Sequence, residues 1–331
     1  MKRLLTVESK MSYSPLSQYD FQNLKDDSDI KSALNIGNIY LICRRPRLFF
    51  KDVSIDDDAL SIKIFQRHTC KEFQFHVDLI QEHIWDGEGT CSIEIGQYLL
   101  PSSSGSWFDS MPKSTDQKQD CQEYDGIKVY KACSGQNKKF VLWLNPEKLI
   151  HLVLLKLIKA EVSGETKDLF SLLNYDVLYV GRTNDMHRRQ THHEHVQEIL
   201  SLEHPQWGDL PAHEICLISL FVSGADEIAH FGEETKTPVY GKTDYYYDLE
   251  KALVRALDPS YNRDKFPKYP SDDKDCILHS KLNYDVLYYS FNIPIVLNCK
   301  GKQIRGMNDM IRVSKDGCVN IVDSFNMDRD L

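Results

Sequence analysis

Alternating apolar and polar positions dominate the first half of the chain and predict short β-strands there. The segment "LSIKIFQRHTCKEFQFHVDL" (60–79) alternates, breaks near Arg67 and His68, and alternates again, which is typical of a β-hairpin. The segment "GIKVYKACSGQNKKFVLWL" (126–144) predicts a second hairpin with Ser134 and Gly135 in its turn. We therefore expect a polar lead-in at residues 1–35, followed by a β-rich N-terminal domain at residues 36–144.

A helix is predicted directly after this domain from its N-terminal signals. Asn145 is a good N-cap, Pro146 suits the first helical position, and Glu147 favours the first turn. We expect residues 145–164 to form a helical linker to a second domain.

The pattern changes to α/β in character over residues 165–270. The run "YDVLYVG" (175–181) is β-prone up to Gly181 and predicts a strand, and "HEICLISLFV" (213–222) predicts another. A helix is predicted over residues 184–202. A second helix follows from apolar residues at helical spacing and ends before Pro259; its apolar residues are Leu249, Ala252, Leu253, Ala256 and Leu257.

The last part of the chain, residues 271–331, predicts a C-terminal extension with a hairpin around Lys300 and Gly301. The expected fold class is therefore α+β: a β-rich N-terminal domain, a small α/β domain and a β-hairpin extension.

Composition narrows the classes of function. The net charge of −9 argues against coating nucleic acid through bulk electrostatics, so any such contact must be local. Nine cysteines without a CxxC pair favour reduced thiols and a cytoplasmic protein. The most apolar stretch (149–158) is too short to span a bilayer and carries His151 and Lys156, so no membrane partner is expected.

The stretch "YVGRTNDMHRRQTHH" (179–193) carries the strongest chemical signal. Arg189 and His193 lie four residues apart, on one face of the predicted helix, and this pair suits a phosphate group. The neighbouring cations Arg182 and Arg188 are predicted phosphate contacts. Nearby histidines also suggest zinc, but no cysteine or acidic ligand set with metal-site spacing accompanies them, so phosphate is favoured.

Two polar residues near the second helix complete the set of candidates. Glu250 borders the apolar face of that helix, where a carboxylate is costly without a metal ion or a cation such as Arg255 or Arg189 beside it. Asn262 follows just beyond "DPSY".

In this order, these residues resemble the GIY-YIG endonuclease superfamily over about residues 170–270. The match consists of "YVG" (179–181), the helix residues Arg189 and His193, Glu250 and the late Asn262. The resemblance implies a metal-dependent endonuclease that hydrolyses phosphodiester bonds of nucleic acid, DNA in preference to RNA. Tyr179, assisted by water, would help to activate the nucleophile, arginine would stabilise charge on the phosphate, and Glu250 would hold one Mg²⁺ or Mn²⁺.

The chain departs from the family at its first motif, Gly-Ile-Tyr, which normally lies on a strand shortly before the second. Residues 165–170 read "ETKDLF" and contain no tyrosine. The first strand is then sought at 138–144, where Trp143 stands in place of tyrosine, and Tyr175 or one of the tyrosines at 245–247 is a substitute in space.

Charge supports a second hypothesis. Residues 165–270 hold 11 Lys and Arg against 18 Asp and Glu, which is more acidic than a domain that grips a long duplex. The alternative is a catalytically inactive GIY-YIG-like recognition or scaffold protein. A protein partner, bound through the β-rich domain, would also ease the conflict by delivering the substrate.

Overall fold

The structure is a computed structural model of the chain. It describes residues 3–17, 20, 28–56, 59–66, 69–79, 90–97, 106–108, 123–132, 138–164, 166–185, 198–199, 202–203, 213–228, 242–271, 276 and 283–324. These residues form two compact units. The first unit takes its described residues from Met1–Arg45, Asn174–His204 and Glu214–Leu331, and the second from Pro46–Leu173 and Pro205–His213.

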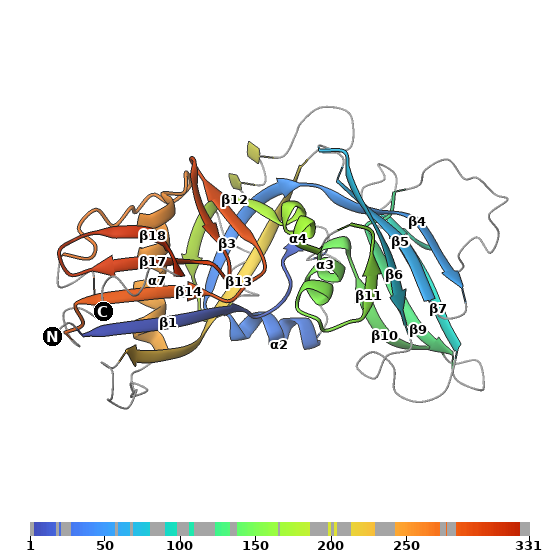
Figure 1. The fold of residues 1–331 in the computed structure, drawn as a ribbon, viewed down its shortest axis with the longest axis horizontal. Helices are drawn as coiled ribbons and strands as arrows, with labels where there is room; N and C mark the ends of the chain where they lie inside the picture. Colours follow the sequence, from blue (N-terminus) through green and yellow to red (C-terminus); the bar gives the residue numbers. More distant parts are fainter. Residues whose placement is uncertain are drawn as a thin grey trace. The chain divides into compact units, whose positions relative to one another are not determined.

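The first unit is built on one large mixed sheet with the strand order β16-β15-β12-β3-β13-β1-β14-β17-β18, and β2 pairs with β13 beside this path (Figure 1). Its elements are β1 (Leu4–Met11), β2 (Leu16–Ser17), α2 (Ser28–Ile36), β3 (Ile39–Pro46), β12 (Asn174–Arg182), β13 (His213–Ile228), α7 (Lys242–Leu257), β14 (Val286–Phe291), β15 (Val296–Cys299), β16 (Lys302–Arg305), β17 (Asp309–Ser314) and β18 (Val319–Asp323).

The second unit contains two four-stranded sheets, in the orders β11-β6-β5-β4 and β10-β9-β7-β8. The pairs β5–β6 and β9–β10 are antiparallel, which confirms the strand pairing of both predicted hairpins. The predicted turn residues, Arg67 and His68 in one and Ser134 and Gly135 in the other, lie outside the described residues. Its elements are β4 (Leu48–Asp56), β5 (Ala59–Gln66), β6 (Lys71–Asp78), β7 (Thr90–Gln97), β8 (Ser106–Phe108), β9 (Gly126–Ala132), β10 (Lys138–Leu144), α3 (Pro146–Leu154), β11 (Ala160–Val162), α4 (Thr166–Leu169) and the 3₁₀-helix η1 (Phe170–Leu172).

The sheet of the first unit nearly closes around α7. This helix packs against β12 and also against β16, β17 and β18, and β16 at one end of the strand order contacts β17 near the other end. The apolar stripe predicted for the helix is buried, with Leu249 and Leu253 fully covered. The mixed α+β class is therefore confirmed, and α7 ends at Leu257, two residues before Pro259, as predicted.

The start of the chain differs from the expected polar lead-in at residues 1–35. Leu4–Met11 forms β1, which pairs antiparallel with β13 and parallel with β14 (Figure 1). Leu4, Leu5 and Val7 are buried because β1 lies inside the sheet. This apolar run is short and lies in a segment that is polar on average, so composition alone does not predict the strand.

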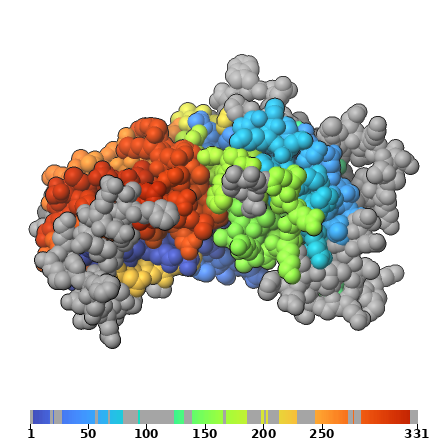
Figure 2. All heavy atoms as spheres, in the orientation of Figure 1, coloured from blue at the N-terminus to red at the C-terminus, as the bar shows by residue number. Residues whose placement is uncertain are grey.

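The C-terminal part is also more integrated than an extension at 271–331. The hairpin predicted around Lys300 and Gly301 is present as β15–β16, but β15 continues the sheet by pairing in parallel with β12. The strands β14, β17 and β18 complete the other end of the sheet. Figure 2 shows these C-terminal strands in red as a continuous part of the surface.

The boundaries between the units fall elsewhere than at residues 144 and 164. Helix α3 begins as predicted, with the side chain of Asn145 accepting a hydrogen bond of 2.7 Å from the backbone of Lys148. It packs on β4 and β10, and β11 pairs with β6, so residues 145–164 belong to the second unit and are not a linker. Strand β3 belongs to the first unit, which the chain leaves after Arg45 and re-enters at Asn174.

The helices of the described residues include none with both the length and the apolar character needed to cross a bilayer.

Candidate active site

Strands β3 and β12 bring together two tyrosines that are far apart in the sequence. The strands are antiparallel, with Gly181 opposite Tyr40 and Tyr179 opposite Ile42. The rings of Tyr40 and Tyr179 are 5.8 Å apart between centroids, with an interplanar angle of 33°. Because side chains alternate between the two faces of a sheet, both rings lie on the same face.

Tyr40 is the residue that sequence reasoning missed. It lies in "GNIYLI" (37–42), where Ile39 and Tyr40 match the last two residues of Gly-Ile-Tyr. The family's spacing predicts the first motif shortly before Tyr179, but in this chain β3 precedes β12 by the whole of the segment Pro46–Leu173. Of the other residues named for this motif, Trp143 lies in the second unit and Tyr175 lies on β12 itself. Tyr247, one of the tyrosines at 245–247, lies on α7 against Arg182.

Gly181 allows the two rings to occupy this face. A Cβ atom at Gly181 would lie 2.6 Å from the ring of Tyr179 and 2.6 Å from the hydroxyl of Tyr40. Tyr40 is buried, with 1% of its surface exposed, whereas Tyr179 is partly exposed. Tyr179 is therefore the ring that solvent reaches, and Tyr40 packs beside it.

The next residue of β12, Arg182, forms an ion pair with Glu250 of α7. Arg182 Nε donates a hydrogen bond of 3.2 Å to Glu250 Oε2, and the two side chains are 23% and 19% exposed. The guanidinium carbon of Arg182 also lies 3.4 Å from the ring centroid of Tyr247. Tyr247 and Glu250 are three residues apart and so share one face of α7, and Arg182 lies against both.

The carboxyl group of Glu250 has an unusual environment. Burial raises its pKa above the ordinary value, and the charge and hydrogen bond of Arg182 only partly oppose this effect. Lys251 lowers the pKa further, and Asp264 raises it. Among the described residues, the cation beside Glu250 is Arg182, for which a phosphate contact was predicted, and not Arg255; Arg189, the other predicted partner, lies outside the described residues.

Asn262 holds β12 in place from the side opposite β3. Its Oδ1 accepts a hydrogen bond of 2.9 Å from the backbone N–H of Val180, and its Nδ2 donates one of 2.7 Å to the carbonyl of Val180. The preceding backbone N–H, of Tyr261, donates to Leu178 O at 3.1 Å. Because both ends of the buried amide bind backbone, Asn262 acts on the predicted site by positioning the strand that carries Tyr179 and Gly181.

Three of the predicted site residues lie outside the described part of the chain: Arg188, Arg189 and His193. The structure resumes at residues 198–199 and 202–203, which are helical. Glu203 there accepts hydrogen bonds of 2.7 Å from Arg44 of β3 and 2.7 Å from the hydroxyl of Tyr261. The residue that follows the predicted helix (184–202) is thus tied to β3 and to the loop that carries Asn262.

Glu250 fits a divalent metal as a single carboxylate ligand. Across the described ranges, the structure contains no group of three or more His, Cys, Asp or Glu side chains that is arranged around a common metal position. Mg²⁺ is commonly bound by one or two carboxylates, with waters and phosphate oxygens as its other ligands. A single carboxylate is thus enough for a Mg²⁺ site but not for a closed structural zinc site, and a metal ion at Glu250 would have to compete with Arg182, which is paired with it.

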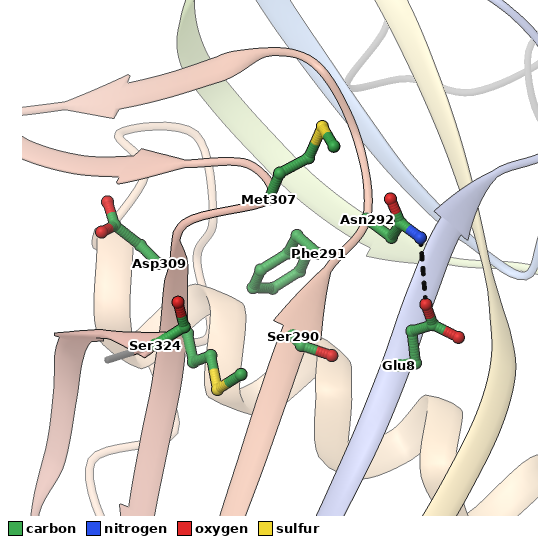
Figure 3. Close-up of a pocket in the computed structure, with 8 residues that line it drawn as sticks. Glu8, Ser290, Phe291, Asn292, Met307, Asp309 and Ser324 are labelled. Carbon is green, nitrogen blue, oxygen red and sulfur yellow. Dashed lines mark hydrogen bonds between the residues drawn. The ribbon is translucent and has the colours of Figure 1, made fainter. Parts of the chain in front are cut away.

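A separate cavity of about 290 Å³ lies in the same unit, at the end of β14 and the start of β17 and beside Glu8 of β1 (Figure 3). Its acidic residues are Glu8 and Asp309, and Asp309 is paired with Arg305. Burial works to raise the pKa of Glu8, but hydrogen bonds from Ser223 and Asn292 and the nearby Lys10 outweigh it, so the pKa is lowered. Its partners thus hold Glu8 in the charged form, whereas burial raises the pKa of Glu250, and a carboxyl group with a raised pKa makes the end of β12 the stronger candidate for chemistry.

Comparison of the chain with protein-family models, with curated proteins and with solved structures finds no match.

Proposed function

We propose that the end of β12 is the active site of a metal-dependent endonuclease of the GIY-YIG type. The observation that carries this proposal is the pairing of β3 with β12, which sets Tyr40 beside Tyr179 and supplies the tyrosine that the resemblance requires. The family order would then be Tyr40, Tyr179, Arg189 and Glu250 along the chain. The second unit would be an insertion between the two tyrosine motifs.

Each described residue has a distinct task in this proposal. Tyr179 is partly exposed and, through a water, helps to activate the attacking hydroxyl. Arg182 offers a planar set of N–H donors to a phosphate oxygen pair. A Mg²⁺ or Mn²⁺ ion held by Glu250 would supply charge neutralisation at the phosphate. Tyr40 and Asn262 position the strand and its tyrosine.

The predicted contributions of Arg188, Arg189 and His193 remain part of the proposal. In sequence they follow directly on the strand end, and Glu203 ties the far end of their segment to β3. DNA is proposed as the substrate in preference to RNA, and the second unit as the surface for a protein partner that delivers it.

The proposal is tested by incubating the protein with plasmid, single-stranded DNA and RNA in the presence of Mg²⁺ or Mn²⁺. We expect cleavage by the wild-type protein and none by Glu250→Ala. The matched control is Glu227→Ala, because Glu227 forms a more exposed ion pair with Arg3 in the same unit. Cleavage that survives Glu250→Ala would remove Glu250 from the mechanism.

One observation favours a second candidate, a recognition or scaffold protein without catalysis. The acid that would bind metal is already paired with Arg182, and the region is acidic in balance. Binding of nucleic acid or of a protein without any cleavage, in both metals and with all three substrates, would support this candidate.

A further inference from the structure

We propose that the guanidinium of Arg182 pairs with the carboxylate of Glu250 until substrate binds. Its stacking on the ring of Tyr247 is kept when it exchanges that carboxylate for a phosphate. This inference rests on the proposed function for the identity of the site. It adds a binding device that the family resemblance does not contain: the protein's own guanidinium competes with a divalent ion for one carboxylate.

The contacts of Arg182 define this arrangement. Its guanidinium lies against the ring of Tyr247 at 3.4 Å and donates to Glu250 at 3.2 Å, so both of its supports come from α7. Stacking of a guanidinium on an aromatic ring does not depend on which anion the N–H groups face. Arg182 can therefore exchange a carboxylate for a phosphate while its contact with Tyr247 is kept.

Electrostatics make the two occupants of Glu250 exclusive. Both side chains of the ion pair are mostly shielded from water, so charges near them are weakly screened. A divalent ion at Glu250 would stand beside the positive charge of Arg182, and the repulsion between the two cations would be strong in this weakly screened position. Metal binding in the free protein is thus expected to require that Arg182 leaves.

The substrate supplies the reason for Arg182 to leave. A phosphodiester carries a negative charge and two free oxygens, which match the planar donors of arginine better than one carboxylate oxygen does. Binding of phosphate by Arg182 would release Glu250, and metal and phosphate would each increase the affinity of the protein for the other. The acid is in this way kept from binding metal tightly in the absence of nucleic acid.

The position of Arg182 in the chain suits this movement. It is the last residue of β12, and the next residue, Thr183, is fixed by a hydrogen bond of 2.9 Å from its N–H to the carbonyl of Asn38. The backbone on both sides is therefore held, and only the long side chain has to change direction. The free-energy cost of moving the side chain is therefore little more than that of breaking its ion pair with Glu250.

The test measures Mn²⁺ affinity by calorimetry and by electron paramagnetic resonance of free Mn²⁺, with no cleavage required. We expect Arg182→Gln to bind Mn²⁺ about tenfold more tightly than wild type, within the usual range of coupling between two sites. Adding Glu250→Gln to this variant should abolish the gain. Equal or weaker Mn²⁺ binding by Arg182→Gln, with unchanged thermal unfolding, would overturn the proposal.

A matched control separates the ion pair from the general loss of one positive charge. Arg263→Gln removes the same charge from a side chain that is 78% exposed in the same unit, and we expect it to leave Mn²⁺ affinity within about twofold, because exposed charges are screened. Tyr247→Ala keeps the charge of Arg182 but removes its support, and should raise Mn²⁺ affinity by a smaller factor than Arg182→Gln. No change in Tyr247→Ala would remove Tyr247 from the device.

The role of substrate is tested with a short DNA oligonucleotide that carries non-hydrolysable phosphorothioate linkages. Its presence should tighten Mn²⁺ binding by wild type and should have little effect on Arg182→Gln; equal tightening in both would contradict the exchange. The proposed nuclease activity and the competition between Arg182 and metal can fail separately. If no cleavage is found but Arg182→Gln binds Mn²⁺ more tightly than wild type, the nuclease is refuted and the competition is supported. If cleavage depends on Glu250 but Arg182→Gln does not bind Mn²⁺ more tightly, the competition is refuted and the nuclease is supported.

Discussion

Tyr40 is the strand partner of Gly181, and this pairing places the ring of Tyr40 beside that of Tyr179. The absence of a side chain at Gly181 makes the arrangement sterically allowed, since a Cβ atom there would meet both rings at 2.6 Å. The structural reason for a glycine after Tyr179 and Val180 is therefore the close approach of two tyrosines and not a turn.

Replacement of Gly181 by alanine should disturb both the fold and the site. Tyr40 is buried and cannot move aside freely, so the added methyl group forces the rings or the strands apart. We expect a loss of about 1–3 kcal/mol in the free energy of unfolding, as for overpacking of a core, together with loss of cleavage. Urea denaturation of the variant measures the first effect.

Gly224 is the matched control for this substitution. It lies on β13 in the same sheet, and a Cβ atom there would meet nothing within 4 Å. Gly224→Ala should change the free energy of unfolding by less than about 1 kcal/mol. Equal costs for the two alanines would show that the contact between Gly181 and the tyrosines does not determine stability.

Replacement of Asn262 by alanine should loosen β12. The substitution removes two hydrogen bonds to the backbone of Val180, which is fully buried, and leaves its N–H and carbonyl without them. We expect a loss of about 1–3 kcal/mol in the free energy of unfolding. The control is Asn320→Ala, at an exposed position on β18, for which less than about 0.5 kcal/mol is expected.

Hydrogen exchange provides a second measurement on the Asn262 variant. The amide of Val180 should exchange faster in Asn262→Ala because its acceptor is lost. An unchanged exchange rate at Val180, with unchanged stability, would mean that Asn262 does not hold the strand and would return it to the list of candidates for direct catalysis.

Glu250 should reduce the stability of the protein at neutral pH. Burial raises its pKa in the folded state, so the carboxyl group favours folding fully below the unfolded value of 4.5, and this contribution is lost as the pH rises through the folded pKa. The glutamine of Glu250→Gln cannot ionise, so this variant does not lose stability as the pH rises. We expect it to be about 0.5–1 kcal/mol more stable than wild type at pH 7.

The pH dependence of this gain is the check. The free energy of unfolding of wild type and of Glu250→Gln, measured with denaturant, should differ at pH 7. The difference should shrink towards pH 4, where the glutamate of wild type becomes neutral like the glutamine of the variant. A variant that is less stable than wild type at pH 7 would indicate that the ion pair with Arg182 outweighs the cost of burying the carboxylate.

Local sequence patterns were sufficient for the elements whose signals lie within a few residues. Both hairpins of the second unit, the N-cap of α3, strand β12 and helix α7 follow from alternation, helical spacing and capping residues. The same patterns placed Glu250 beside an apolar helix face, where it needs a cation. These predictions depend on neighbours in the sequence and therefore did not require knowledge of the fold.

The remaining features depend on contacts between distant segments. Tyr40 joins the site only because β3 pairs with β12 across the inserted second unit, and β1 joins the sheet only because β13 and β14 lie on its two sides. No periodicity reports such pairings. The one available signal for Tyr40 was the "IY" pair (39–40) itself, which becomes informative once a long insertion between the two motifs is considered.

The choice of partner for Glu250 was undecidable from the sequence for a similar reason. The sequence suggested Arg189 or Arg255 as its partner and assigned Arg182 to phosphate. Packing of α7 on β12 selects Arg182, and the position of Tyr247 three residues before Glu250 then fixes the direction of its side chain.

The most direct test of the account is the single-turnover rate of DNA cleavage with Mn²⁺ for wild type, Tyr179→Phe and Glu250→Gln. Tyr179 lies on β12 and Glu250 on α7, and the account requires both in one reaction. We expect each substitution to lower the rate by about 10²-fold or more while the variants stay folded. Cleavage by folded Tyr179→Phe or Glu250→Gln at the wild-type rate would contradict the account.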